Sequence, residues 1–309
     1  MGGHPPSALR SCGDIRTLAV PPRSRKFPRG APFRIRVDPD PAIHHWPIWD
    51  NIAKWLPFAR DAKATQGMTY CVGILLNDGI IFASDSRTHA SVDNYAKFCK
   101  MTVFERAGDR VIVLLSSGNL AGTQAVVSVL NQRGEAGDAT PSLWTARTMF
   151  DAVNLVSDAM REIEHRDGAH LEEGGVSFNA SFIVGGQIKG ERMRLFRIYA
   201  EGNFIEAGLD TPYIQTGETK YGKPIIDRVI TPSAGLADAA KCVLVSFDST
   251  MRSNLSVGMP IDLLCYERDS LAVTMRRRFD EGDPYFASLS REWSEGTRAV
   301  FRQLPALQW

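Results

Sequence analysis

The stretch Thr69–Ser86 constrains the fold more than any other part of the chain. Two apolar runs, TYCVGILL and GIIFASDS, are joined through Asn77-Asp78-Gly79. Short runs rich in β-branched and aromatic residues, separated by Asn, Asp and Gly, are typical of a tight β-hairpin. The sequence therefore predicts that a globular domain opens with two antiparallel strands.

The loop of this hairpin determines which side chains meet. A three-residue loop with Gly79 in the left-handed conformation pairs Leu76 with Ile80. Thr69 then lies opposite Arg87, and Asp85 lies one diagonal step away on the same face, roughly 7–8 Å between backbones. A two-residue loop would move Asp85 to the other face. The turn residues permit a site that contains Thr69 and Asp85, and they do not require it.

The segment before the hairpin has a different composition. Residues 1–67 hold 10 of the 17 prolines and three of the six tryptophans, with 11 Lys+Arg against 5 Asp+Glu. Such a segment shows no helical or strand period and is expected to stay extended or disordered. We interpret 1–68 as a leader: translated upstream sequence with Met68 as the true start, a propeptide cut before Thr69, or an organelle transit peptide. Residues 69–309 form the predicted domain.

Composition excludes several classes of function. The five cysteines are odd in number and lack CxxC spacing, so they suggest neither a disulfide framework nor a zinc site, and no cofactor is implied. No apolar run reaches the 18 or so residues of a membrane span. The domain is slightly acidic, which gives no argument for a nucleic-acid partner. We expect a protein of the reducing cytoplasm.

The remaining elements follow from periodicity and turn signals. Residues 119–133 predict a helix with Asn119 as N-cap, and residues 142–166 predict a longer helix capped by Ser142. The order along the chain is strands, two helices, strands, two helices, strands and a terminal helix. Two facing antiparallel sheets with paired helices outside, an α+β four-layer αββα sandwich, would bury all these faces; a single mixed sheet is the alternative. The other predicted strands are 96–105, 109–118, 180–188, 192–202, 203–208, 212–217 and the hairpin 260–279, and the other predicted helices are 220–230, 235–253 and 285–304.

Thr69 is the candidate nucleophile. A threonine hydroxyl needs an adjacent base, and an N-terminal threonine carries its own in the α-amine, whose ordinary pKa is near 7.7–8.0. In mid-chain the same nitrogen is an amide and accepts no proton. Because an initiator methionine is normally trimmed before a small residue, translation from Met68 would expose Thr69 directly. A lysine near the amine, oriented by a carboxylate, would lower the pKa of the amine, and Lys100 and Asp85 are the candidates.

With these residues the chain resembles a proteasome-type β subunit of the N-terminal-nucleophile hydrolases, and more closely the bacterial proteasome homologue Anbu. The resemblance rests on TYCVGILLNDGIIFASDSR, KFCKM, SSGNLAGTQ, SFIVGG, FRIYAEG and FDSTMRSN, and it covers Met68 to about residue 275. It departs from classical β subunits at Met68, where they have glycine, and in a C-terminal helical extension from about residue 280. That extension could serve assembly.

The resemblance implies roles for single residues. Thr69 would be the nucleophile, and Asp85 and Lys100 would support its amine, with Lys97 as the fallback lysine. Gly118 would give the oxyanion-hole N–H, and Arg87 would anchor the local network. Asp248 would be a supporting aspartate with Ser253 as its weaker companion. The loop that carries the family's supporting serine reads QTGETKYG, where Thr216 is the substitute.

The function implied is that of a threonine peptidase acting on peptides or unfolded proteins inside a homo-oligomeric particle. Two alternatives remain open: a non-catalytic assembly subunit, and an amide-forming or acyl-transferring enzyme with a non-protein substrate. The sequence leaves undetermined the substrate preference, ring or spiral assembly, and the need for an ATPase partner.

Overall fold

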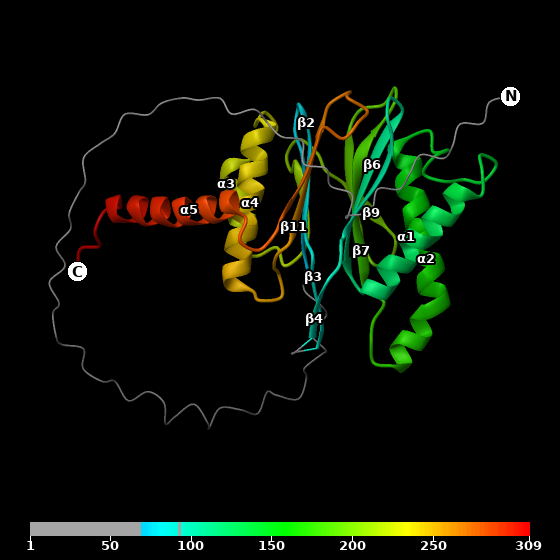
Figure 1. The fold of residues 1–309 in the computed structure, drawn as a ribbon, viewed down its shortest axis with the longest axis horizontal. Coiled ribbons are helices and arrows are strands. Elements are labelled where there is room, and N and C mark those ends of the chain that lie inside the picture. Colours follow the sequence, from blue (N-terminus) through cyan, green and yellow to red (C-terminus); the bar gives the residue numbers. More distant parts are fainter. Residues whose placement is uncertain (1–68, 92–93) are drawn as a thin grey trace. The chain divides into compact units, whose positions relative to one another are not determined.

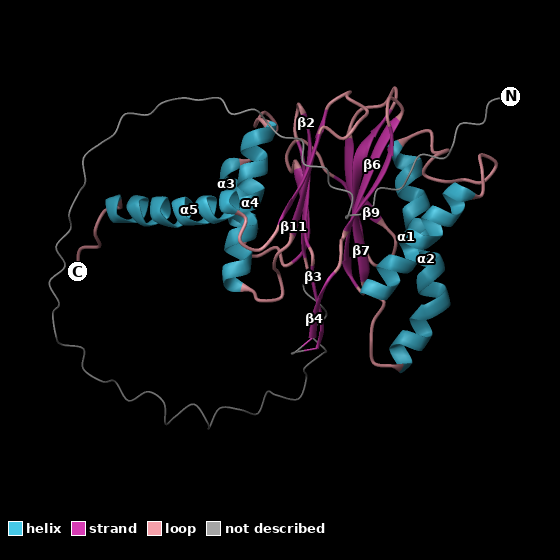
Figure 2. Ribbon diagram, viewed as in Figure 1, coloured by secondary structure: helices cyan, strands magenta, loops and turns pink. Residues whose placement is uncertain are grey.

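A computed structural model describes residues 69–91 and 94–309 of the chain. The predicted leader, residues 1–68, lies outside the described residues. Two five-stranded antiparallel sheets face each other, and helices cover their outer faces (Figure 1, Figure 2). The predicted four-layer αββα sandwich is confirmed, and the single mixed sheet is not what forms.

The first sheet contains the opening hairpin at its centre. Its strand order is β10-β1-β2-β11-β12, and every neighbouring pair is antiparallel. The strands are β1 Tyr70–Leu75, β2 Gly79–Asp85, β10 Tyr213–Gly217, β11 Ile261–Glu267 and β12 Met275–Phe279.

The second sheet has the order β5-β6-β7-β8-β9. The single strand predicted over residues 96–105 is divided, because a small separate hairpin of β3 and β4 ends before β5 begins. The strands are β3 Arg87–Ser91, β4 Asn94–Lys97, β5 Met101–Arg106, β6 Arg110–Gly118, β7 Ala180–Ile188, β8 Arg194–Ile198 and β9 Phe204–Glu206.

The helices pack in two pairs, one on each outer face. Helices α1 Leu120–Glu135 and α2 Met149–Glu173 cover the second sheet, while α3 Lys223–Val229 and α4 Leu236–Ser253 cover the first (Figure 1). Helix α5 Pro284–Gln303 begins against α4 and then projects away from it (Figure 2). In the described part of the chain, no helix is both long enough and apolar enough to span a bilayer.

The hydrophobic core has three layers. A central cluster that includes Phe82, Leu115 and Leu195 fills the space between the two sheets. Two outer clusters pack the helices onto the sheets, around Val153 of α2 and around Phe247 of α4. Because apolar residues of β1 and β2 alternate between the central cluster and the α4 cluster, the opening hairpin is buried on both faces.

The predicted register of the opening hairpin is wrong by one residue. Leu75 pairs with Ile80 and Cys71 with Ser84, so the loop consists of Asn77 and Asp78 only. Gly79 belongs to β2 and not to the loop. The reason is tertiary, because β11 pairs with β2 as far as Gly79 and extends the strand by one residue.

The two long helices of the second sheet differ in how well their starts were predicted. Asn119 caps α1 by accepting a hydrogen bond from Gly122 N at 3.0 Å, which confirms that prediction. Ser142 does not cap α2. The helix begins later, where Thr148 and Asp151 form a reciprocal capping box.

Candidate active site

Thr69 lies directly before β1 and is 5% exposed. Its carbonyl accepts a hydrogen bond from Glu218 N at 2.7 Å, which fixes its backbone against the end of β10. Thr69 lines a cavity of about 300 Å³ together with Lys100 and Gly118. Three residues that are far apart in the sequence therefore line the same cavity.

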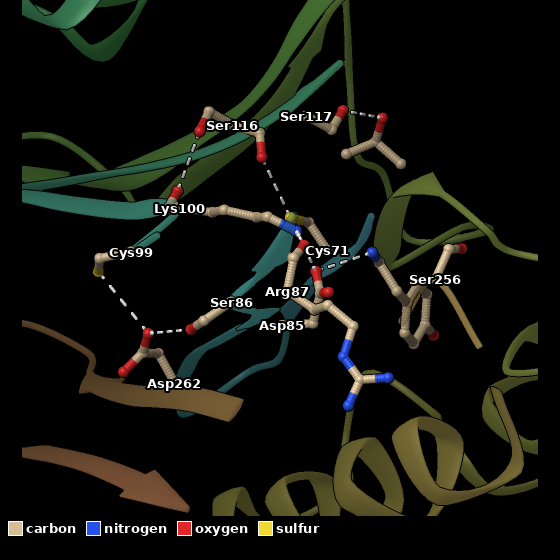
Figure 3. Close-up of polar contacts among 12 residues, drawn as sticks. Cys71, Asp85, Ser86, Arg87, Cys99, Lys100, Ser116, Ser117, Ser256 and Asp262 are labelled. Atoms are coloured by element: carbon tan, nitrogen blue, oxygen red, sulfur yellow. Dashed lines mark hydrogen bonds and ion pairs between the residues drawn. The ribbon is translucent and has the colours of Figure 1, made fainter. Parts of the chain in front are cut away.

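The two-residue loop moves Asp85 to the face opposite the predicted one, but at the end of β2 its carboxylate still forms a buried ion pair with Lys100, which lines the cavity together with Thr69. Lys100 Nζ lies 2.7 Å from Asp85 Oδ1, and the two side chains are 5% and 0% exposed. The same Asp85 oxygen accepts a hydrogen bond from Tyr70 N at 3.1 Å, which holds the carboxylate against the residue that follows Thr69. Figure 3 shows the lysine and the carboxylate turned toward each other.

The charge on Asp85 depends on the charge on Lys100. Burial raises the pKa of the Asp85 carboxyl, and the Lys100 ammonium and the N–H groups of Tyr70 and Gly258 oppose that rise. Lys100 Nζ also donates to Arg87 O at 2.6 Å. These two bonds use two of the three ammonium donors of Lys100, and no acceptor for the third occurs within 69–91 and 94–309.

Gly118 ends β6 at the rim of the cavity. It has φ +97°, and a Cβ atom on it would lie 1.8 Å from Asn179 O. Only glycine fits such a position. The turn from β6 into α1 therefore brings backbone, without a side chain, to the wall of the cavity that Thr69 also lines.

Comparison with known proteins gives a clear relative. A scan against protein-family models and a search of curated proteins found no match. Among solved structures, an Anbu Gly-1 mutant from Hyphomicrobium sp. strain MC1 is 51% identical, with a TM-score of 0.73, covering 78% of this chain and 100% of that chain. Anbu (ancestral beta-subunit) from Yersinia bercovieri is 46% identical, with a TM-score of 0.73, over 78% and 99% of the two chains.

A third structure is that of the helical assembly of the Anbu complex from Pseudomonas aeruginosa. It is 47% identical, with a TM-score of 0.74, and covers 78% of this chain and 98% of that chain. The chain belongs to the Anbu family. It is thus a member of the proteasome-like family to which the sequence motifs pointed, and its fold is that of the Anbu structures.

Within this Anbu chain, Arg87 lies beside the pair and not opposite Thr69. Its Nη1 donates to Leu255 O at 2.9 Å, and its own carbonyl accepts from Lys100. The neighbouring Ser86 Oγ donates to Asp262 Oδ2 on β11 at 3.1 Å, which ties the end of β2 to the next strand (Figure 3). The predicted role of Arg87 as an anchor stays a prediction, and these contacts are compatible with it. Lys97, the fallback lysine, is exposed and lies near Glu281.

Asp248 and Ser253 do not join the Thr69 cluster. The buried Asp248 carboxylate lies 3.0 Å from Arg252 Nε, one turn along α4, and Ser253 is exposed. The helix ends at Ser253, and the chain that follows supplies the group near Asp85, which is the N–H of Gly258. The sequence predicted supporting residues at the end of α4. In the structure, the segment after this helix is the part that lies near Asp85.

Thr216 takes part in a buried group of hydroxyls. Its Oγ1 lies 2.8 Å from Ser117 Oγ and 2.9 Å from Ser181 Oγ, and the two serines are 2.7 Å apart. The three residues come from β10, β6 and β7, so the group joins the two sheets at the base of the cavity, which Ser117 lines. This arrangement favours a structural role for Thr216.

Glu218 and Asn254 are not among the site residues predicted from the sequence. Glu218 is buried, and its Oε2 accepts a hydrogen bond from Asn254 Nδ2 at 2.9 Å. Glu218 stands two residues after Thr216 in the QTGET segment already singled out, so an acidic residue beside that position was the available signal. No group of three or more His, Cys, Asp or Glu side chains suited to a metal occurs within 69–91 and 94–309.

Proposed function

We propose that this Anbu-family protein is a threonine-type peptidase that uses Thr69 as an N-terminal nucleophile. The observation that carries the proposal is the buried Asp85–Lys100 pair next to Thr69 at a cavity of about 300 Å³. A buried ion pair is costly to form, and replacing such a pair by apolar residues is often neutral or stabilising. Its presence at the rim of a cavity favours a chemical role.

The reaction follows from the groups at the cavity. Thr69 Oγ1 attacks the carbonyl carbon of a peptide bond while its proton passes to the α-amine. The N–H of Gly118 stabilises the negative charge on the carbonyl oxygen. The protonated amine then gives its proton to the leaving nitrogen, the C–N bond breaks, and water hydrolyses the ester on Thr69. Lys100, oriented by Asp85, lowers the pKa of the amine so that it acts as a base near neutral pH.

The test is labelling by a threonine-reactive electrophile, combined with intact mass and N-terminal sequencing of the protein from its host. We expect a fraction that starts at Thr69 and carries one label, and no label on Thr69→Ala. Thr231→Ala, an exposed threonine on the loop before α4, is the matched control and should label normally. Equal labelling of Thr69→Ala, or protein that all starts at Met1, would overturn the proposal.

A cysteine nucleophile is the competing source of label. Burial raises the pKa of Cys242 to about 11 and that of Cys265 to about 12, and it also raises the pKa of the Cys71 thiol. Thiols that stay protonated react slowly. Labelled protein without turnover of any peptide would favour a non-catalytic assembly subunit, and transfer of the acyl group to an added amine would favour an acyl transferase.

We also propose that the working form is a homo-oligomer in which α5 contacts another copy of the chain. Of the residues of α5 only Phe286 is buried, whereas Trp293, Val300 and Phe301 are exposed on the part that leaves the body. Because most helical stability in proteins comes from packing of an amphipathic face, a helix of which only Phe286 is buried is expected to have a further packing partner. The Pseudomonas aeruginosa Anbu structure is that of a helical assembly.

The size of the particle in solution tests the proposal that α5 contacts another copy of the chain. Replacing Trp293, Val300 and Phe301 together by polar residues should give smaller particles in sedimentation velocity at equal protein concentration. The replacement of exposed Leu209, Val229 and Leu255, none of which lies on α5, is the matched control. Unchanged particles in the α5 variant would exclude this helix as an assembly surface.

A further inference from the structure

Glu218 is a buried carboxylate for which the described residues provide no cation. The residue is 4% exposed, and its side chain accepts one hydrogen bond, from the neutral amide of Asn254. No Lys, Arg or His side chain within 69–91 or 94–309 pairs with it. A buried charge normally needs an opposite charge as well as hydrogen bonds. Glu218 therefore lacks the counter-charge that its burial calls for.

Thr69 is the direct neighbour of Glu218 across the sheet. Tyr70 pairs with Gly217 in the β1–β10 register, and Glu218 N donates to Thr69 O at 2.7 Å. Gly217 has φ +83°, and a Cβ atom on it would lie 1.8 Å from Thr69 O, so the two backbones are in close contact. Side chains of opposed residues start about 4.5–5.5 Å apart, which a glutamate can span to reach the neighbouring main-chain nitrogen.

The amide of Asn254 fixes the direction of the Glu218 carboxylate. Asn254 Oδ1 accepts hydrogen bonds from Ser256 N at 2.9 Å and Ser256 Oγ at 2.6 Å. Because a main-chain N–H can only donate, the amide oxygen must face Ser256 and the NH₂ group must face Glu218. Glu218 is thus oriented as an acceptor by a side chain whose own bonds are satisfied.

We infer that Glu218 is the counter-ion of the α-ammonium group that Thr69 carries once it is the first residue of the chain. The inference rests on the proposed function in one respect, which is that Thr69 becomes the N-terminus. Removal of the preceding residue creates the missing cation next to the carboxylate. Glu218 is then a positioning residue: it orients the amine and sets its proton affinity without touching the substrate.

Two opposing electrostatic effects act on the amine. The charged groups around Thr69 are Lys100 and Asp85 of the buried pair, Arg87 on β3, and Glu218 beside the backbone. The cations lower the pKa of the amine, and the Glu218 carboxylate raises it. Without Glu218 the amine should lose its proton at lower pH and should be less well fixed. The acidic limb of any pH–rate profile should move to lower pH.

The pKa of the amine can be measured without turnover. The protein is produced from Met68 and so retains every residue of the three hydrophobic clusters. Intact mass confirms that it begins at Thr69. Acetylation of the α-amine by acetic anhydride is followed across pH by mass spectrometry. We expect Glu218→Gln to lower the midpoint of acetylation by about one pH unit, and Glu218→Asp, which keeps the charge, to stay closer to the wild type. Glu206→Gln, a carboxylate on β9 paired with Arg194, is the control and should not shift the midpoint.

An unchanged or raised midpoint in Glu218→Gln would overturn the inference. Thermal unfolding checks that each variant is folded. If Glu218→Gln does not fold, Asn254→Ala should shift the midpoint in the same direction by a smaller amount, and no shift there would count against the inference. If Glu218→Gln shifts the midpoint of acetylation but the wild type hydrolyses no peptide, Glu218 is the counter-ion of the amine and the proposal of a peptidase is wrong. Protein that keeps a residue ahead of Thr69 would instead reject the N-terminal nucleophile itself.

Discussion

The two ends of the sandwich both join the sheets through buried polar side chains, but in different ways. At the Thr69 end, defined by Thr69, Asp85 and Lys100, a charged pair faces a cavity. At the Gln187 end, defined by Gln187, Tyr266 and Asp269, a neutral amide links β7 to β11 and the loop after it. Gln187 Oε1 accepts from Tyr266 Oη at 2.6 Å and Asp269 N at 2.9 Å, and its Nε2 donates to Asp269 Oδ1 at 2.6 Å.

This difference separates a structural polar cluster from the cluster for which we propose a chemical role. The hydrogen bonds at the Gln187 end satisfy that amide and leave it no free group for a ligand. At the Thr69 end the ammonium of Lys100 keeps a donor directed away from its two partners, and Thr69 adds a hydroxyl at the cavity wall. Burial of a polar group alone therefore does not point to a functional site, whereas a buried charged pair beside a cavity marks a candidate site.

The largest effect is expected for Lys100→Met. The variant leaves Asp85 buried without its cation, which typically costs about 3–5 kcal/mol of unfolding free energy. It also removes the charge next to the amine, so labelling of Thr69 should fall by about 100-fold or more. Chemical denaturation and the rate of electrophile labelling measure the two effects.

The double variant Asp85→Asn/Lys100→Met sharpens this result. It should recover much of the lost stability because no unpaired charge remains buried, and it should stay unreactive. Recovery of labelling in the double variant would mean that the pair serves the fold and not the chemistry.

A smaller effect, limited to stability, is expected for Gln187→Leu. Tyr266 Oη and Asp269 N would lose their acceptor, and each buried unsatisfied group costs about 1–3 kcal/mol. The rate of Thr69 labelling should stay within about twofold of the wild type, because Gln187 lies at the other end of β7 from Ser181. A loss of labelling comparable to that of Lys100→Met would contradict the comparison.

The smallest effect is expected at an exposed ion pair. Lys223 and Asp227 lie 2.9 Å apart on the surface of α3, and solvent screens their attraction. Lys223→Met should change the unfolding free energy by less than about 1 kcal/mol and leave labelling unchanged. A cost equal to that of Lys100→Met would show that charge removal, and not burial, dominates both results.

The fold was predictable because its elements are strongly periodic. The helices, their order and the strands of the two large sheets agree with the sequence expectation, as does Asn119 as the cap of α1, whereas the small β3–β4 hairpin was not expected. The other errors fall at boundaries, namely the hairpin register, the start of α2 and the division of the strand predicted over 96–105. At the hairpin, pairing with β11 extends β2 to Gly79. At α2 the signal is local, because Thr148 has its capping-box partner Asp151 three residues later.

The residues of the candidate site that belong to short local motifs could be predicted from the sequence. Thr69, Lys100 and Gly118 line one cavity, and Asp85 pairs with Lys100 beside it, although their chemical roles stay predictions. The roles of Asp248 and Ser253 stay predictions, and the Asp248 carboxylate pairs with Arg252 of its own helix. Glu218 and Asn254 were missed because their meaning depends on which backbone lies opposite them.

The amino-acid order alone determined which layers form, since alternation of apolar residues along a strand or helix selects the face that must leave water. Three-dimensional contact alone decided that Glu218, which follows β10, lies opposite Thr69, which precedes β1, and that α5 leaves the body almost uncovered. The physical reason is the distance along the chain over which each effect acts. Hydrophobic patterning acts within one segment, whereas the electrostatic environment of the Thr69 nitrogen depends on groups from distant parts of the chain.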